Sequence, residues 1–206
     1  MRVLVSYGSK RGGTAGLAAM IGHAFENAGV MADVAPARTV RSLDGYDAVI
    51  VGGALYMSRW HRDARRFVRR HAARLSERPV WLFSSGPLDD SSASTEIEPV
   101  AQVSSAMRLC HARGHMTFGG RLSPQARGFP ASAMAKKQAG DWRDEAQVNR
   151  WVDDLTGQLG RAAGGAPTSR GSRPLPDTGQ ASRVPVSGQA THRTDGPWVD
   201  DAGGGS

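Results

Sequence analysis

The sequence is poor in cysteine and has no long hydrophobic run. A single cysteine, Cys110, excludes an intrachain disulfide framework and a zinc site built on cysteines. The longest apolar runs, such as 48–54, have the length of a strand, whereas a transmembrane helix needs about 20 residues. The first residues show no secretory signal pattern. We therefore expect a soluble cytoplasmic protein.

Lysine is also scarce, so arginine carries most of the positive charge, and the formal net charge is +7. At helical spacing, the face opposite the apolar residues of the segment 59–75 is filled by arginines, namely Arg59, Arg62, Arg65, Arg66, Arg69, Arg70 and Arg74. Two interpretations are open: a solvated face, or peripheral contact with an anionic membrane at its inner face. Stacking aromatics do not interleave with these arginines, so no nucleic acid is expected as a partner.

The composition changes at Gly160. The segment 160–206 contains no Ile, Phe, Tyr or Met and shows neither helical nor strand periodicity. Such a segment buries too little apolar surface to offset an ordering entropy of about 1–2 kcal/mol per residue. We expect a domain over residues 1–159 and a disordered tail over 160–206.

Strand patterns alternate with helix patterns over the first 159 residues. We expect strands at 3–7, 30–36, 47–54, 79–86 and 115–122, and helices at 14–28, 60–75, 100–113 and 145–159. This alternation predicts an α/β fold, a doubly wound parallel sheet of five strands with helices on both faces. Ligands bind such sheets beyond the carboxyl ends of the strands, so the candidate loops are 8–13, 54–60 and 84–90.

The first of these loops is rich in glycine and lies between a buried strand and a helix start. Successive backbone N–H groups at a helix N-terminus form a cradle for an anion. The Walker A ending and the three spaced glycines of dinucleotide-binding folds are both absent. A phosphate loop for a mononucleotide and an ordinary turn capped by Thr14 remain as alternatives.

The motif Ser9-Lys10-Arg11-Gly12-Gly13-Thr14, which follows the strand 3–7, resembles the FMN-phosphate loop of flavodoxins. The segments 52–61, 67–71 and 140–142 are similar to one branch of the flavodoxin-like domains, the branch of menaquinone-dependent protoporphyrinogen oxidase. The resemblance covers residues 1–159 and none of the tail.

The resemblance implies a flavodoxin-like fold with FMN as cofactor. It assigns the phosphate to Ser9, Lys10, Arg11, Gly12, Gly13 and Thr14, and the flavin ring to Ala54, Leu55, Tyr56, Ser84, Ser85, Gly86 and Pro87. Tyr56 is expected to stack on the ring or, alternatively, to cover the end of the sheet. Ser84 and Ser85 are expected to contact the polar edge of the ring or to cap free backbone groups. No catalytic residue and no metal site is assigned.

The resemblance further implies an FMN-dependent oxidoreductase, with a quinone or another redox partner. A basic domain and a second flavin loop without an aromatic residue favour an enzyme over an electron carrier. The family's long basic insertion before the last helix is short here, with Phe129 as its sole aromatic residue. The alternative is therefore an electron-transfer or FMN-binding module without its own substrate. We interpret His71 as a packed core residue, and leave open whether His61 gives protons to a substrate.

Overall fold

The computed structural model describes residues 1–86, 97–125 and 139–164. Pro87, most of the short segment after Leu122 and the predicted tail from residue 165 onward lie outside these residues.

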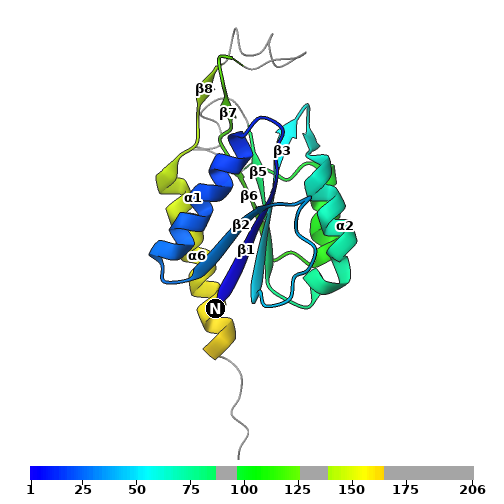
Figure 1. Cartoon of the computed structure of the whole chain (residues 1–206), viewed down its shortest axis with the longest axis vertical. Coiled ribbons are helices and arrows are strands. Elements are labelled where there is room, and N and C mark those ends of the chain that lie inside the picture. Colours follow the sequence, from blue (N-terminus) through cyan, green and yellow to red (C-terminus); the bar gives the residue numbers. More distant parts are fainter. Residues whose placement is uncertain (87–96, 126–138, 165–206) are drawn as a thin grey trace, which may run out of the picture. The chain divides into compact units, whose positions relative to one another are not determined.

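A parallel sheet forms the centre of the fold (Figure 1), in the order β2-β1-β3-β5-β6. Its strands are β1 (Arg2–Gly8), β2 (Met31–Pro36), β3 (Ala48–Tyr56), β5 (Val80–Ser85) and β6 (Gly114–Phe118). This arrangement confirms the predicted doubly wound α/β sheet. The chain order reverses between β1 and β3, so the carboxyl ends of these two strands mark the edge at which such sheets bind ligands.

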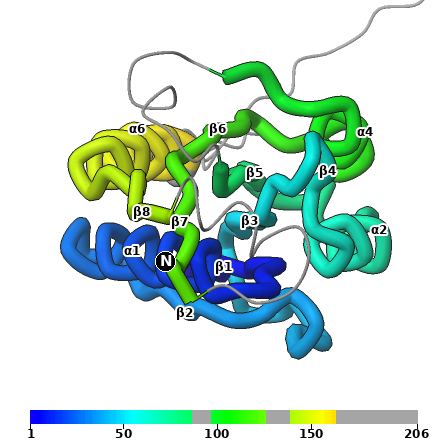
Figure 2. Tube along the Cα trace, turned by 90° about the horizontal axis from the view of Figure 1, so that it is seen from above, coloured from blue at the N-terminus to red at the C-terminus, as the bar shows by residue number. Residues whose placement is uncertain are grey.

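Helices cover both faces of the sheet, as Figures 1 and 2 show. Helices α1 (Gly13–Asn27) and α6 (Glu145–Gly164) cover one face, and α2 (Arg62–Ser76) and α4 (Ala101–Cys110) cover the other. Helix α6 therefore continues beyond the predicted end at Leu159, and α4 ends before the predicted Arg113. Among the residues described, no helix is long and apolar enough to cross a membrane.

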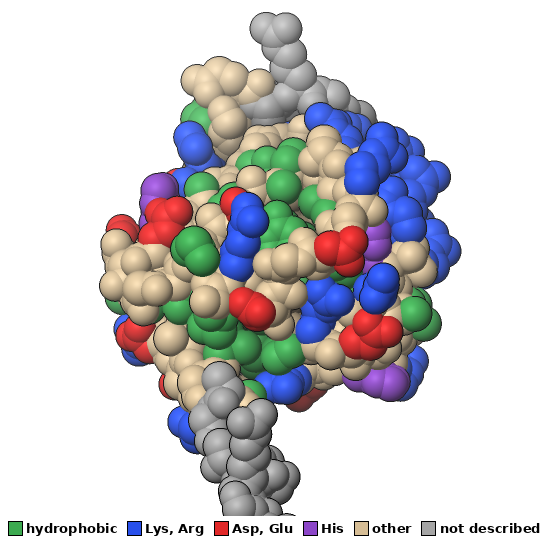
Figure 3. All heavy atoms as spheres, turned by 60° about the horizontal axis from the view of Figure 1, so that its bottom comes forward, with side chains coloured by type: hydrophobic (Ala, Val, Ile, Leu, Met, Phe, Trp, Pro, Cys, Tyr) green, Lys and Arg blue, Asp and Glu red, His purple; other side chains and the backbone are tan. Residues whose placement is uncertain are grey.

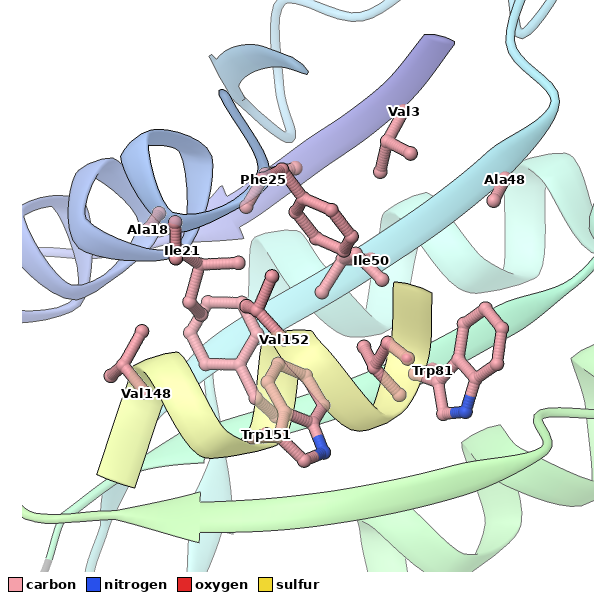
Figure 4. Close-up of a cluster of buried hydrophobic side chains, with 14 of the residues drawn as sticks. Val3, Ala18, Ile21, Phe25, Ala48, Ile50, Trp81, Val148, Trp151 and Val152 are labelled. Atoms are coloured by element: carbon pink, nitrogen blue, oxygen red, sulfur yellow. The ribbon is translucent and has the colours of Figure 1, made fainter. Parts of the chain in front are cut away.

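The core between the sheet and α1/α6 is built from alternate residues of the central strands (Figure 4). Ile50 of β3 lies opposite Phe25 of α1, and Trp151 of α6 makes edge contacts with the rings of Phe83 and Phe118. Each of these side chains is at most 7% exposed. Burying one large apolar side chain contributes about 1.5–3 kcal/mol, so this layer anchors β1, β3 and β5 firmly.

The second core lies between the sheet and α2/α4 and uses the intervening strand residues. Helix α2 buries one face, with Ala64, Phe67, Val68, His71 and Leu75 against the sheet, and exposes most of its arginines. The predicted amphipathic pattern of α2 is therefore confirmed. His71 packs against the Phe67 ring at 4.8 Å between ring centroids, as expected of a core residue.

The prediction that the second helix begins at Trp60 is wrong. Trp60 belongs to β4 (Arg59–Trp60), which pairs antiparallel with the end of β3. The turn at Met57 and Ser58 has both residues in the left-handed region, with φ of 47° and 57°, and reverses the chain. The Trp60 indole then packs on Gly53, where a side chain would leave no room for it, and donates to the Phe83 carbonyl at 3.3 Å.

The predicted strand 115–122 is also too long. β6 ends at Phe118, and the chain then forms β7 (Arg121–Leu122), which pairs antiparallel with β8 (Gly140–Asp141) in a separate two-stranded sheet. The break falls at Gly119, where the Trp142 backbone leaves no room for a side chain. The predicted strand 115–122 thus covers two strands that belong to different sheets.

Candidate functional site

The three candidate loops lie side by side at the carboxyl edge of the sheet. Gly8 at the end of β1 is in register with Gly53 of β3, which is in register with Ser84 of β5. A side chain on Gly86 would begin 3.5 Å from the Leu55 Cβ, so the second and third loops approach closely. The fold therefore brings the described residues of the predicted phosphate and ring sets to one edge.

No side chain caps the start of helix α1. Its N-cap is Gly12, which has φ of 83° and provides no side chain to cap the helix, and its first turn contains no acidic residue. The Gly12 N–H donates to the Ser9 hydroxyl at 3.1 Å, which shapes the turn. The first N–H groups of a helix lack internal partners and carry partial positive charge. This start fits a phosphate group, and the alternative of a helix capped by Thr14 is not observed.

The phosphate loop is connected to the ring loop through Arg11 and Tyr56. The Arg11 guanidinium lies 5.8 Å from the centre of the Tyr56 ring, within the range of a cation–π contact. The Tyr56 hydroxyl is buried and has no hydrogen-bond partner among the described residues. A buried polar group of this kind normally has a partner, so the polar part of a ligand fits beside Tyr56.

Ser84 and Ser85 end β5 and are buried. The Ser84 hydroxyl lies 2.9 Å from Nε2 of His115 on β6, so its partner is a neighbouring side chain. Burial lowers the pKa of His115 to about 4, which keeps the imidazole neutral near pH 7. The geometry therefore assigns Ser84 a structural hydrogen bond within the sheet.

A cavity of about 150 Å³ lies beside the phosphate loop, with Tyr7, Ser9, Gly12, Ala15, Pro36, Arg38 and Asp63 around it. Arg38 and Asp63 were missed by the sequence analysis. Arg38 lies in the loop after β2, and Asp63 lies in the first turn of α2, both at this same edge of the sheet. Arg38 adds positive charge next to the exposed start of α1.

Helix α2 begins in the opposite way, with a capped N-terminus. The Asp63 N–H donates to Nδ1 of His61 at 3.2 Å, and the imidazole packs on Gly8 at the end of β1. Burial lowers the pKa of His61, and Asp63 opposes this shift only in part. A neutral ring that accepts at Nδ1 serves as a helix cap, so the structure does not favour His61 as a proton donor. Within the described residues no group of three side chains is arranged to hold a metal ion.

The sequence model of the flavodoxin domain matches residues 4–137, which is more than half of the chain. The chain belongs to the flavodoxin domain family. A curated relative is the protoporphyrinogen IX dehydrogenase [quinone] of Escherichia coli K12, which is 27% identical over 86 residues, 41% of this chain and 48% of that protein. The chain thus matches about half the length of this relative.

Solved flavodoxins share the architecture of this member of the family. Oxidised flavodoxin 1 from Bacillus cereus is 13% identical with a TM-score of 0.51, covering 76% of this chain and 98% of that one. A short-chain flavodoxin associated with a bacterial microcompartment is 12% identical with a TM-score of 0.52, covering 77% and 99%. At such identities the likeness shows a common fold, so the chemistry must be argued from the site.

Proposed function

We propose that this flavodoxin-family protein is an FMN-dependent oxidoreductase that holds the FMN phosphate at the start of α1. The observation that carries the proposal is the uncapped Gly12 start, which has no acidic residue in its first turn. Backbone donors of this kind bind phosphate at helix N-termini. The phosphate would be held by the motif predicted for it, Ser9, Lys10, Arg11, Gly12, Gly13 and Thr14.

The flavin ring would lie between the loops that follow β3 and β5. The buried Tyr56 hydroxyl and the close approach of Gly86 to Leu55 support this location. The residues concerned are those predicted for the ring, Ala54, Leu55, Tyr56, Ser84, Ser85, Gly86 and Pro87. Pro87 lies outside the described residues, and the Ser84 hydroxyl is already paired with His115. Bound FMN supplies electron transfer, whereas the protein supplies binding and orientation.

The substrate we propose is a porphyrinogen, with a quinone as electron acceptor. Support comes from the E. coli relative, which is a protoporphyrinogen IX dehydrogenase [quinone]. Arg59 and Arg62 are exposed next to the ring loop, at β4 and at the start of α2. Guanidinium groups form charge-assisted hydrogen bonds to carboxylates, so these two arginines would orient the propionates of the substrate.

The second candidate function is an electron-transfer or FMN-binding module without its own substrate. The position of His61 favours this candidate. This titratable side chain lies next to the ring loop, but its Nδ1 accepts a hydrogen bond that caps α2, so it does not serve as a proton donor. Electron transfer needs no proton donor of this kind. The match to only 48% of the E. coli relative is also compatible with a module that lacks part of that enzyme's function.

The test begins with the purified full-length protein, which should be yellow and release one FMN on denaturation. A colourless protein that cannot be reconstituted with FMN would overturn the proposal. The FMN-loaded protein should then oxidise protoporphyrinogen with menaquinone as acceptor. The double variant Arg59→Gln with Arg62→Gln should slow turnover and leave the flavin spectrum unchanged. The control pair Arg66→Gln with Arg74→Gln should change neither turnover nor the spectrum. Electron exchange with a reductase, without turnover with any quinone, would instead establish the second candidate.

A further inference from the structure

The arginines of α2 fall into two groups according to their contacts. Arg70 donates to the carbonyls of Ala37 and Val40, at 3.3 and 2.8 Å, and therefore has a structural role. By contrast, the Nε atom of Arg65 has no hydrogen-bond partner within the described part of the chain, and Arg69 is exposed. Figure 3 shows Lys and Arg side chains gathered on the side of the molecule where Figure 1 has α2. Part of this positive charge is thus available to another molecule.

A groove between α2 and α4 runs beside these arginines. It has a volume of about 310 Å³, with Arg65 and Arg69 of α2 along one wall, Leu109 of α4 along the other, and Val68 and Ala106 at its base. Leu109 is 46% exposed, which is unusual for a large apolar side chain on this domain. The groove therefore combines an apolar base with positive charge on one side.

Arg65 has a second property that points to an acidic occupant. Its Nε atom is buried and has no acceptor among the described residues. Leaving a buried donor unsatisfied costs about 1–3 kcal/mol, and more when the group is charged. Arg65 as a whole is only partly buried, so a carboxylate in the groove would pair with the accessible part of the guanidinium and neutralise its charge.

The groove is also connected to the proposed ring loop. Gln102, which lines the groove on α4, accepts a hydrogen bond from the Trp60 N–H of β4 at 3.1 Å. β4 is paired with the end of β3, where the ring-binding residues lie. A molecule bound in the groove would therefore sit next to the edge of the sheet at which flavin is proposed to bind.

We propose that this groove is a docking site for an acidic segment of a partner protein. The segment places carboxylates against Arg65 and Arg69, and an apolar side chain on Val68, Ala106 and Leu109. A concave groove with an apolar base suits a peptide segment in a way that it does not suit the flat surface of a lipid bilayer. Peptide binding in this groove does not require FMN, so the proposal can be tested independently of the proposed function.

The probe for the experiment is a fluorescein-labelled synthetic peptide in which leucine and glutamate recur at helical spacing. Its binding to the full-length protein is measured by fluorescence anisotropy at low and high salt, because charge pairing is screened by salt. The double variant Arg65→Gln with Arg69→Gln should weaken binding about tenfold or more, since both carboxylate partners are lost. The control pair Arg62→Gln with Arg66→Gln removes equal charge outside the groove and should change affinity by less than about threefold.

The variant Leu109→Glu provides a test that does not alter the Arg65 guanidinium. Leu109 is largely exposed, so the substitution should leave the fold intact while a new carboxylate repels the acidic peptide. We expect a loss of affinity similar to that of the Arg65 and Arg69 pair. A peptide in which leucine is replaced by serine at constant charge should bind more weakly, since the apolar contact is gone.

Two results would overturn the proposal. Equal losses in the two arginine pairs would show general attraction of an acidic peptide to a basic surface, with no groove involved. Failure to bind the peptide, together with binding to phosphatidylglycerol vesicles that both arginine pairs weaken equally, would show that the arginines contact an anionic membrane instead.

Discussion

Helices α1 and α2 both begin at the carboxyl edge of the sheet, on opposite faces of β1, yet their first turns differ in capping and in side-chain charge. The first turn of α1 has no side-chain cap and no acidic residue, whereas α2 is capped by His61 and carries Asp63. Helix α1 contains no arginine, and α2 contains six. One helix therefore offers backbone donors to a ligand inside the site, and the other offers side-chain charge to a partner outside it.

The difference also shows what makes a helix N-terminus a binding site. Both helices have the same dipole and the same unpaired N–H groups. In α2 a side chain of the protein satisfies one of these donors, so less remains for a ligand. In α1 the glycine at the cap position leaves them without a side-chain cap, beside a cavity lined by Arg38.

The largest effect is expected from closing the start of α1 with a side chain. Gly12→Val should reduce FMN affinity about a hundredfold or more, because the valine would occupy the space of the phosphate. Gly29→Val is the matched control, since both glycines have positive φ, 83° and 76°, and open space around them. Both variants should lose about 1–2 kcal/mol of stability. Titration of FMN by fluorescence quenching should show a loss only at Gly12, and equal affinities would place the phosphate elsewhere.

A second experiment makes α1 resemble α2 by adding an acidic residue to its first turn. Ala15 lines the cavity beside the phosphate loop, so Ala15→Glu should lower FMN affinity about thirtyfold through charge repulsion. The same carboxylate should stabilise the helix by about 0.3–1 kcal/mol. Affinity and stability would then change in opposite directions, which thermal melts and FMN titration can measure. Ala19→Glu, one turn further along α1, should leave FMN affinity unchanged.

The sequence predicted the parallel sheet because Val3, Val5 and Ile50 stand in short apolar runs that only a doubly covered strand explains. It failed at Trp60, where local helical spacing continued into a hairpin. The hairpin depends on a long-range contact of the indole with Gly53 and Phe83, which no local pattern encodes. For the same reason the sequence missed the end of β6, where Gly119 packs against the distant Trp142 backbone.

The sequence predicted where the candidate site lies, but it did not predict the hydrogen bonds within it. The loop 8–14 carries its own signal, because glycines and hydroxyls at a helix start are a local pattern. The partner of Ser84 and the cap formed by His61 were not predictable, because each depends on residues brought together by tertiary structure. Arg38 was not predictable either, because the loop after β2 carries no glycine-rich motif that would mark it as part of a binding site.

The third prediction is that acid destabilises the face of the sheet covered by α2 and α4 more than the face covered by α1 and α6. His61 and His71 on the α2 side, and His115 on β6, all have lowered pKa values, mainly through burial, whereas His23 of α1 is exposed. A lowered histidine pKa means that the unfolded chain binds protons first, so stability is complete above about pH 6.5 and falls as the pH decreases.

For His115, with a pKa of about 4, this linkage costs about 1 kcal/mol between pH 8 and pH 5.5. Urea denaturation at the two pH values should show the loss, and His115→Gln should remove most of it. Hydrogen exchange should show α2 losing protection at pH 5.5 before α1. A uniform loss over both helices would argue against a difference between the two faces.

The smallest effect is expected from deleting residues 165–206. We propose that the segment after α6 is a tail that does not pack on the domain. Its sequence lacks the regular spacing of apolar residues that packing requires. Removing it should change the unfolding free energy by less than about 0.5 kcal/mol and leave FMN affinity unchanged. A clear drop in melting temperature would show that the segment packs on the domain.

The most direct test of the central claim compares FMN with riboflavin, which carries the same ring and lacks the phosphate. If the open start of α1 holds the phosphate, the apoprotein should bind FMN about a hundredfold more tightly than riboflavin. In the Ala15→Glu variant this preference should shrink, while riboflavin affinity should stay as it is in the unmodified protein. Equal affinities for the two flavins in the unmodified protein would contradict the account.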